Sequence, residues 1–426
     1  MTLSERDKAI IWHPFTQEKT AVEPLAIQRG EGSYVYDEHD TRYLDLISSW
    51  WVNLHGHAHP EIARAIYDQA STLEHILFAG CTHEPAVKLC EQLKSILSDK
   101  LTRFFFSDNG STCVEVALKM ASQYWYNREQ KARPLFISFE GGYHGDTFGA
   151  MSVGAQSGYH DPFKALFFKV LSVPFPATWD GDEDVDTKEE HALACLSRYL
   201  SEHQSDIAAI ILEPLMQGAS GMRMCRPSFV KTVIERVRQA GILVIFDEVM
   251  TGFGRTGTTF AYEQLDCVPD FLCVSKGITG GFLPLALTIT TDQIYEAFLS
   301  DHWHHAFAHG HSYTANPIAC AAAVASFDIL MRPETQTAIA AIHEAQKKGL
   351  AYLQKTCSGV GKMRVLGTIA AFDVHAQDMN LLKKTFLQAG FLVRPIGNTV
   401  YLLPPYSTTP DELSLAWQKI AEIILK

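Results

Sequence analysis

Two charged residues follow apolar runs that have the composition of buried strands. Lys276 comes after FLCVS and is trailed by three glycines in KGITGG, and Asp247 ends the run ILVIFD. A carboxylate at the end of so apolar a run needs a charged or hydrogen-bonding partner, because burying it alone is costly. A lone strand-end lysine usually reaches solvent. A Lys that forms a Schiff base and an Asp that keeps a pyridine nitrogen protonated are together what pyridoxal 5'-phosphate requires, so the pair indicates that cofactor.

A glycine-containing turn could hold the phosphate of such a cofactor. In SDNGSTCVEVALK a strand leads through Asn109, Gly110 and Ser111 into a helix, so that backbone N–H groups and a hydroxyl would face an anion at the positive end of the helix dipole. The same residues also make an ordinary turn and helix cap. In GGYHGDT, Tyr143 offers a ring that could stack on a flat heterocycle.

Two other patterns suggest different chemistry but are weaker. Gly252, Gly254 and Gly257 in GFGRTG match the dinucleotide fingerprint, yet DEVMT separates them from the preceding strand and puts two carboxylates where phosphates would bind. The histidines of HGHAH and HWHHAFAHGH could bind zinc, but no Cys pair or Glu stands at a recognised ligand spacing. We therefore expect no nicotinamide cofactor and no metal site.

The elements that must position these residues alternate along the chain. Apolar runs at 101–107, 134–140, 207–214, 242–249 and 271–277 are separated by segments with helical periodicity, such as 111–125. This order predicts an α/β fold with a mostly parallel sheet covered on both faces. Ligands of such sheets bind beyond the carboxyl ends of the strands, where 107–111, 141–146, Glu213, Asp247 and Lys276 all fall.

The flanks have a different pattern, with short strand-like runs between helices. We expect a large cofactor-binding domain over 61–330 and a smaller α+β domain built from 1–60 and 331–426. In IIWHPFTQ, Pro14 disfavours regular structure. We expect SSWW to be extended, so that at most one of Trp50 and Trp51 lines a given pocket.

Composition excludes several classes of partner. A formal net charge of -12 disfavours nucleic-acid binding, which needs a basic surface. The chain contains no apolar run of about eighteen residues that could span a bilayer. MTLSERDKAI lacks the apolar core of a signal peptide, so we expect a cytoplasmic protein that acts on a small molecule.

Several segments together resemble the class III aminotransferases, and the resemblance runs over nearly the whole chain. They are FFFSDNGSTCVEVALKMA, GGYHGDTFGAMSVG, IILEPLMQGASGM, VIFDEVMTGFGRTG, VSKGITGG and GHSYTANP. The resemblance implies a fold-type I, pyridoxal-phosphate-dependent transferase that works as a homodimer with an active site shared between its subunits.

The resemblance also implies roles for single residues. Lys276 would carry the Schiff base, Asp247 would pair with the pyridine nitrogen, and Tyr143 would stack near the ring. The cofactor would further contact Gly110, Ser111 and Glu213, together with His311 of the partner subunit and Ser312 of the partner subunit. The substrates would contact Phe15, Trp50, Trp51, Tyr143, Asp146, Arg255, Lys276, Gly310 and Arg394.

Within that family, WHPFTQ, SSWWVNLHGHAHP and VRPIGNTVYLLPPY are similar to members that transaminate 8-amino-7-oxononanoate in biotin biosynthesis. This likeness implies S-adenosylmethionine as the amino donor, or lysine, since many such members have Tyr where this chain has Phe15. Related enzymes that use ornithine, 4-aminobutyrate or other ω-amines, or that isomerise glutamate semialdehyde, remain alternatives. So do a nicotinamide-dependent oxidoreductase and a non-catalytic binding protein, which would not need Lys276.

Overall fold

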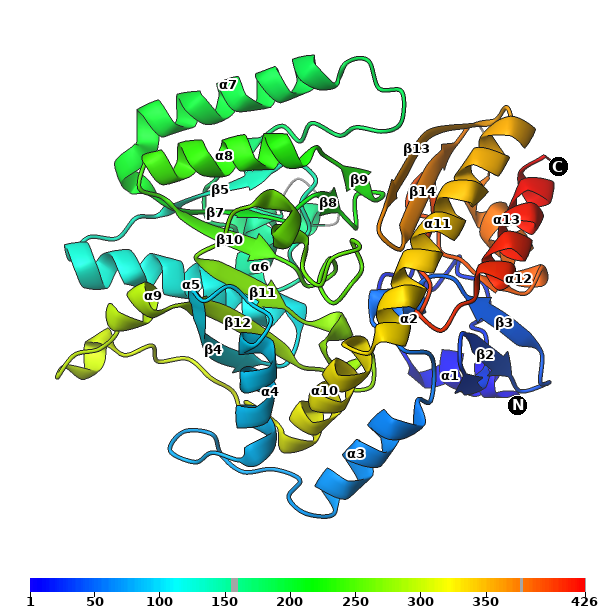
Figure 1. The fold of residues 1–426 in the computed structure, drawn as a ribbon, viewed down its shortest axis with the longest axis horizontal. Helices are drawn as coiled ribbons and strands as arrows, with labels where there is room; N and C mark the ends of the chain where they lie inside the picture. Colours follow the sequence, from blue (N-terminus) through cyan, green and yellow to red (C-terminus); the bar gives the residue numbers. More distant parts are fainter. Residues whose placement is uncertain (155–159, 376–377, 426) are drawn as a thin grey trace.

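The computed structural model describes residues 1–154, 160–375 and 378–425, which form a larger and a smaller part side by side (Figure 1). A seven-stranded sheet forms the centre of the larger part. Its strands, in order across the sheet, are β4 (Leu101–Ser107), β12 (Ala286–Thr291), β11 (Phe271–Val274), β10 (Leu243–Asp247), β7 (Ile207–Leu212), β5 (Leu135–Phe139) and β6 (Val170–Val173). β12 runs antiparallel to both of its neighbours, and the strands from β11 to β6 are parallel.

Helices cover both faces of this sheet, as Figure 1 shows. On β10, Ile245 packs in one cluster with α5 (Gly110–Glu129), whereas Val244 and Phe246 pack in another with α7 (Val185–His203) and α8 (Pro227–Gln239). Because successive strand residues point to opposite faces, a strand buried on both sides must be apolar at every position. The predicted α/β class is confirmed.

The other elements of the larger part surround this core. They are α3 (Pro60–Ala70), α4 (Glu84–Lys94), α6 (Phe148–Val153), α9 (Asp292–Glu296), α10 (Pro317–Leu330) and the hairpin of β8 (Met216–Gln217) and β9 (Arg223–Met224). Among the described residues, no helix is both long and apolar enough to cross a membrane.

The smaller part is built from both ends of the chain. One sheet contains β1 (Ile27–Glu31), β2 (Tyr34–Asp37), β3 (Arg42–Asp45) and β15 (Phe391–Leu392), and the other β13 (Val360–Leu366), β14 (Ile369–Val374) and β16 (Thr399–Leu402). The helices are α1 (Leu3–Ile10), α11 (Pro333–Thr356), α12 (Met379–Gln388) and α13 (Pro410–Ile424). β15 pairs in parallel with β3, which joins the two termini in one sheet. The boundaries at residues 60 and 330 stay a prediction.

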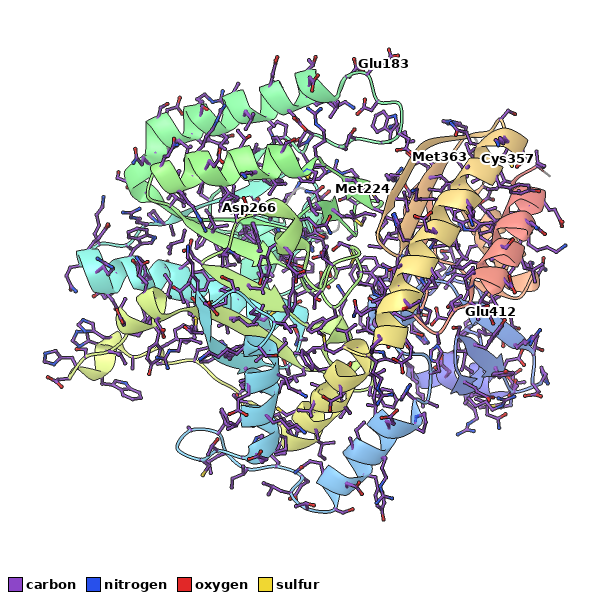
Figure 2. All side chains as sticks on the ribbon, viewed as in Figure 1. Glu183, Met224, Asp266, Cys357, Met363 and Glu412 are labelled. Carbon is purple, nitrogen blue, oxygen red and sulfur yellow. The ribbon has the colours of Figure 1, made fainter. Side chains whose placement is uncertain are left out.

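The two parts touch at the β8–β9 hairpin. Arg364 of β13 donates from Nε to the carbonyl of Met222 (2.9 Å), and Figure 2 labels Met224 and Met363 on the two sides of this contact. The hairpin follows Glu213 closely in the chain, so this contact lies near the site described below.

The tryptophan segment differs from the sequence expectation. Ser48, Ser49, Trp50 and Trp51 have φ values of 49°, 46°, 71° and 75° and form the left-handed turn α2 (Ser48–Trp51), so the prediction of an extended segment was wrong. Such a conformation costs roughly 1–2 kcal/mol per residue outside glycine. Four consecutive residues hold it here, which means that surrounding contacts enforce the turn.

Candidate active site

A cavity of about 940 Å³ lies where the carboxyl ends of the large sheet face the smaller part. Most of the predicted site residues line it, namely Phe15, Trp50, Trp51, Gly110, Ser111, Tyr143, Glu213, Asp247, Lys276 and Arg394. Both tryptophans belong to this set, so the expectation that only one could line a pocket was wrong. The left-handed turn removes the alternation of sides on which that expectation rested.

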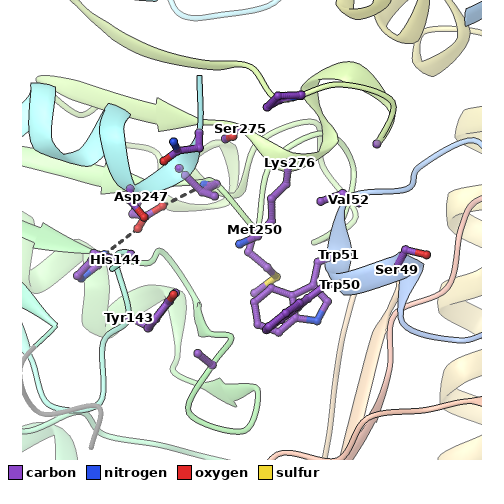
Figure 3. A pocket seen from close by; sticks show the side chains of 18 of the residues that line it. Ser49, Trp50, Trp51, Val52, Tyr143, His144, Asp247, Met250, Ser275 and Lys276 are labelled. Atoms are coloured by element: carbon purple, nitrogen blue, oxygen red, sulfur yellow. Dashed lines mark hydrogen bonds and ion pairs between the residues drawn. The ribbon is translucent and has the colours of Figure 1, made fainter. Parts of the chain in front are cut away.

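Lys276 extends into the cavity, with Asp247 and His144 on one side and Trp50 and Trp51 on the other (Figure 3). It starts a short 3₁₀ helix (Lys276–Thr279) and has a left-handed φ of 43°. Burial lowers the pKa of the Lys276 amine, against the opposing effect of the carboxylates of Asp247 and Glu213. A lowered pKa favours the neutral amine, which is the nucleophilic and basic form.

Asp247 has a buried partner that the sequence analysis missed. Its Oδ2 lies 2.7 Å from Nδ1 of His144, and its Oδ1 accepts from the backbone N–H of Val249 at 3.1 Å. Both side chains are almost fully buried. His144 directly follows Tyr143 in GGYHGDT, and that position was the only signal that could have indicated it. These contacts hold the carboxylate in one orientation at the edge of the cavity.

The start of α5 forms an anion cradle beside this carboxylate. Asn109 caps the helix by accepting from Thr112 N, and a Cβ at Gly110 would lie only 2.7 Å from the Val249 side chain. Ser111 Oγ accepts from the backbone N–H of Asp146 at 3.0 Å, so its own proton can be donated to a ligand. Backbone N–H groups, a hydroxyl donor and the helix dipole together fit a phosphate.

Glu213 lies at the same end of the cavity. It accepts from the backbone N–H groups of Tyr143 (3.1 Å) and Gly218 (2.9 Å). Burial raises the pKa of Glu213 to about 7, with a further increase from the charge of Asp247 and a decrease from His144. Glu213 therefore adds less negative charge near Lys276 than an exposed carboxylate would.

The opposite end of the cavity is aromatic and positively charged. The guanidinium of Arg394 lies 4.2 Å from the ring centroid of Trp50, and Phe15 meets the same indole edge-on at 5.6 Å. In the described ranges no carboxylate forms an ion pair with Arg394. Ile396 and Tyr401 add further walls that the sequence analysis did not single out. This end can accept a long apolar ligand that ends in an anion.

Five of the predicted residues do not line the cavity: Asp146, Arg255, Gly310, His311 and Ser312. Asp146 borders it, because its Oδ2 accepts from the hydroxyl of Tyr143 at 2.8 Å. Arg255 is only 1% exposed and donates to the carbonyls of Asn53 (2.8 Å) and Pro404 (2.9 Å). In this chain Arg255 therefore shapes the backbone around the site.

GFGRTG does not form a dinucleotide-binding turn. The segment consists of turns, and the backbone N–H groups at the start of the next short helix (Ala261–Leu265) donate to the buried carboxylate of Glu248. A protein carboxylate thus occupies the position that a pyrophosphate would need. Across the described parts of the chain, no three His, Cys, Asp or Glu side chains are grouped so that they could hold a metal ion.

A buried lysine opposite a fixed carboxylate, beside a phosphate cradle, is the arrangement of a pyridoxal-phosphate-type site on an α/β fold. The family model for class III aminotransferases matches residues 15–424, and the chain belongs to this family.

Comparisons with individual proteins agree with this assignment. The chain is 49% identical to the adenosylmethionine-8-amino-7-oxononanoate aminotransferase of Synechococcus elongatus (97% of this chain, 98% of the relative) and 39% identical to that of Helicobacter pylori (99% and 97%). The crystal structure of the Methanocaldococcus jannaschii protein of the same name has a TM-score of 0.92 at 36% identity (99% and 98% covered). A PLP-bound amine transaminase from an uncultivated Pseudomonas species has a TM-score of 0.91 at 31% identity (97% and 98%).

Proposed function

We propose that this protein transaminates 8-amino-7-oxononanoate to 7,8-diaminononanoate, a step of biotin biosynthesis, with pyridoxal 5'-phosphate as cofactor and S-adenosylmethionine or lysine as amino donor. The observation that carries the proposal is a single cavity with Lys276 and Asp247 at one end and, at the other, Arg394, which forms no ion pair within the described parts of the chain. The names of the relatives support the choice of acceptor.

The residues at the sheet end fit the cofactor. Ser111 and the backbone at Gly110 would hold its phosphate, Asp247 would pair with its ring nitrogen, Tyr143 would pack near the ring, and Lys276 would bind its carbonyl carbon. When bound, the cofactor supplies an electron sink for the pair of electrons left when a proton leaves the amine-bearing carbon. His144 fixes the orientation of Asp247 and strengthens it as a partner for a positively charged nitrogen.

Lys276 moves the proton in both half-reactions. Its Nζ takes a proton from the amine-bearing carbon of the donor and passes it on to the bound cofactor. In the second half-reaction Nζ carries a proton back and delivers it to the carbon that bore the keto group of the acceptor. Burial lowers the pKa of the Lys276 amine, so the neutral base is available at a smaller cost than at the protein surface. The indole of Trp51, whose centroid lies 4.8 Å from Nζ, limits the directions that this amine can take.

The other end of the cavity selects the acceptor. Arg394 would bind the carboxylate of the nonanoate chain in the forked geometry of a guanidinium, and Phe15 and Trp50 would cover its methylene groups. Many relatives that use this acceptor have Tyr at the position of Phe15. Because Phe15 lacks the hydroxyl that such a Tyr could offer to S-adenosylmethionine, lysine remains an alternative amino donor.

We also propose a homodimer in which His311 and Ser312 of each subunit complete the phosphate site of the other. Neither residue lines the cavity of its own chain, and Ser312 is exposed on the loop before α10. A monomer that retains full activity at all concentrations would contradict this part of the proposal.

The test is an assay of the purified protein with 8-amino-7-oxononanoate as acceptor and S-adenosylmethionine, lysine, ornithine or 4-aminobutyrate as donor. Lys276→Ala should abolish turnover and the visible absorption band that borohydride bleaches in the wild type. No product with any of the four donors would end the assignment of this acceptor and leave another class III aminotransferase as the alternative. Half the wild-type activity in Lys276→Ala would end the assignment of this lysine.

A further inference from the structure

We infer that Asp45, which does not line the cavity, is a positioning residue that holds the left-handed turn Ser48–Trp51 and thereby places the two tryptophans of the acceptor pocket. The inference rests on the proposed function and deepens it, because it concerns how the apolar end of that site is built. Asp45 is the last residue of β3 and its side chain is fully buried.

Three donors converge on this carboxylate. The backbone N–H of Ile47 donates to Oδ1 (3.2 Å), the hydroxyl of Ser49 donates to Oδ2 (2.7 Å), and Nε2 of His57 lies 3.0 Å from the same Oδ2. A buried carboxylate is tolerated where its oxygens are satisfied in this way. Two of the three donors belong to the turn or to the residue before it, so the carboxylate binds the turn directly.

The turn needs such support because its four residues have positive φ and none is glycine. Conformations of this kind persist only where the surroundings determine them. Other contacts act on its ends: Ser48 Oγ donates to the carbonyl of Leu403 (2.7 Å), and Trp51 Nε1 donates to the hydroxyl of Tyr401 (3.0 Å). Asp45 adds two further ties to the first half of the turn, through the backbone of Ile47 and the side chain of Ser49.

The turn determines what the cavity presents at both ends. The direction of each Cβ follows from the backbone angles, so a right-handed or extended segment would turn at least one indole away from the cavity. In the left-handed turn, Trp50 lies between Phe15 and Arg394, and Trp51 lies over Lys276 Nζ. Loss of the Asp45 contacts should therefore disturb the acceptor end through Trp50.

Arg255 ties the end of the turn from another direction. Its Nη2 donates to the carbonyl of Asn53 at 2.8 Å and lies 3.4 Å from that of Trp51. The negative charge of Asp45 is also among the groups that favour the charged form of this buried guanidinium. The segment from Asp45 to Asn53 is thus held between a buried anion at its start and a buried cation at its end.

The experiment compares Asp45→Asn and the milder Ser49→Ala with a matched control, Asp37→Asn. Asp37 is also a buried strand carboxylate of the small part, but its donors are Thr41 N, His39 N and the hydroxyl of Tyr43, none of which belongs to the turn. Each full-length variant is loaded with cofactor. The measurements are KM for 8-amino-7-oxononanoate, the single-turnover rate of the donor half-reaction, thermal unfolding and the near-ultraviolet circular dichroism of the indoles.

We expect Asp45→Asn to raise KM for the acceptor by roughly tenfold, and Ser49→Ala by less. The donor half-reaction should stay within about twofold of wild type, because Trp51 beside Lys276 keeps its own hydrogen bond to Tyr401. The indole signal should change in both variants, and Asp37→Asn should leave it and KM unaltered. Equal effects of Asp45→Asn and Asp37→Asn on unfolding, with an unaltered KM and indole signal in Ser49→Ala, would overturn the inference. If the wild type does not use this acceptor, the proposed function fails, but the indole signals still test whether Asp45 holds the turn.

Discussion

Gly145 lies so close to Ser111 that any side chain there should damage the phosphate cradle. Its φ is +121°, and a Cβ built on it would lie 2.6 Å from the Cα of Ser111. That atom belongs to the backbone at the start of α5, which Asn109 caps, and it cannot swing aside as the end of a flexible side chain could. We expect Gly145→Ala to displace Ser111 and break its hydrogen bond from Asp146 N.

The size of the effect follows from two contributions. An unfavourable φ costs about 1–3 kcal/mol in a residue other than glycine, and overpacking of a rigid contact costs another ~1–3 kcal/mol. In the cofactor-free Gly145→Ala variant, Ser111 can move away from residue 145, and this movement relieves the overpacking. Binding of the cofactor must reverse that movement, so ~1–3 kcal/mol appears as weaker binding, or a Kd raised roughly 5- to 150-fold.

The assay is a titration of the cofactor-free protein with pyridoxal 5'-phosphate, followed by visible absorbance, next to urea unfolding. Gly80→Ala is the matched control, because Gly80 has a φ of +94° but no atom lies within 4 Å of the point that its Cβ would occupy. It should lose stability through backbone strain and bind the cofactor with unaltered affinity. Equal affinities of Gly145→Ala and Gly80→Ala would refute the assignment of Ser111 to the phosphate.

Three further outcomes test the electrostatics and packing around the site. Burial raises the pKa of Glu213 from 4.5 to about 7, so the folded protein keeps a proton that the unfolded chain has released. The stability of the wild type relative to Glu213→Gln should therefore fall as pH rises from 4.5 to 7, and a flat difference in urea titrations would contradict this. Gly349→Ala would drive a methyl group into the buried indole of Trp417. The overpacking costs ~1–3 kcal/mol and should outweigh a helix-propensity gain of about 1 kcal/mol, so urea titrations should show a less stable protein. Arg394→Lys keeps the charge but loses the fork, and should raise KM for the acceptor roughly tenfold while sparing the donor half-reaction; an unaltered KM would exclude Arg394 as the carboxylate ligand.

The sequence was sufficient to predict five strands of the central sheet, but not β6 or β12, and to place Lys276 and Asp247 at its carboxyl edge. β7 is buried on both faces and is apolar at every position, as is β10 up to its last residue, Asp247, which distinguishes both strands from loops without knowledge of their partners. Lys276 and Asp247 follow such runs directly, and parallel strands bring their carboxyl ends to one edge. The apolar pattern of each strand and the topology of the sheet therefore predict the same location for these two residues.

The tryptophan turn and the partner of Asp247 could not be predicted in this way. The left-handed turn is unfavourable for each of its own residues and exists because Asp45, Leu403 and Tyr401 hold it, two of which lie some 350 positions away in the chain. His144 meets Asp247 across a separation of 103 positions. Propensities describe neighbours in sequence, so contacts of this range appear only when the chain is folded.

The contacts of Arg255 also determine when the site can form during synthesis. The guanidinium donates to the carbonyls of Asn53 and Pro404, which lie near opposite ends of the chain. In the same way, β3 has its strand partner β15 only after most of the chain has been synthesised. At about 5–20 residues per second, a ribosome needs roughly 20–70 s to make the chain between these points. Throughout that interval one edge of β3 lacks its strand partner and is open to pairing with other chains. The pocket is therefore completed last, and an interrupted chain should be an aggregation-prone substrate for chaperones rather than a partly active enzyme.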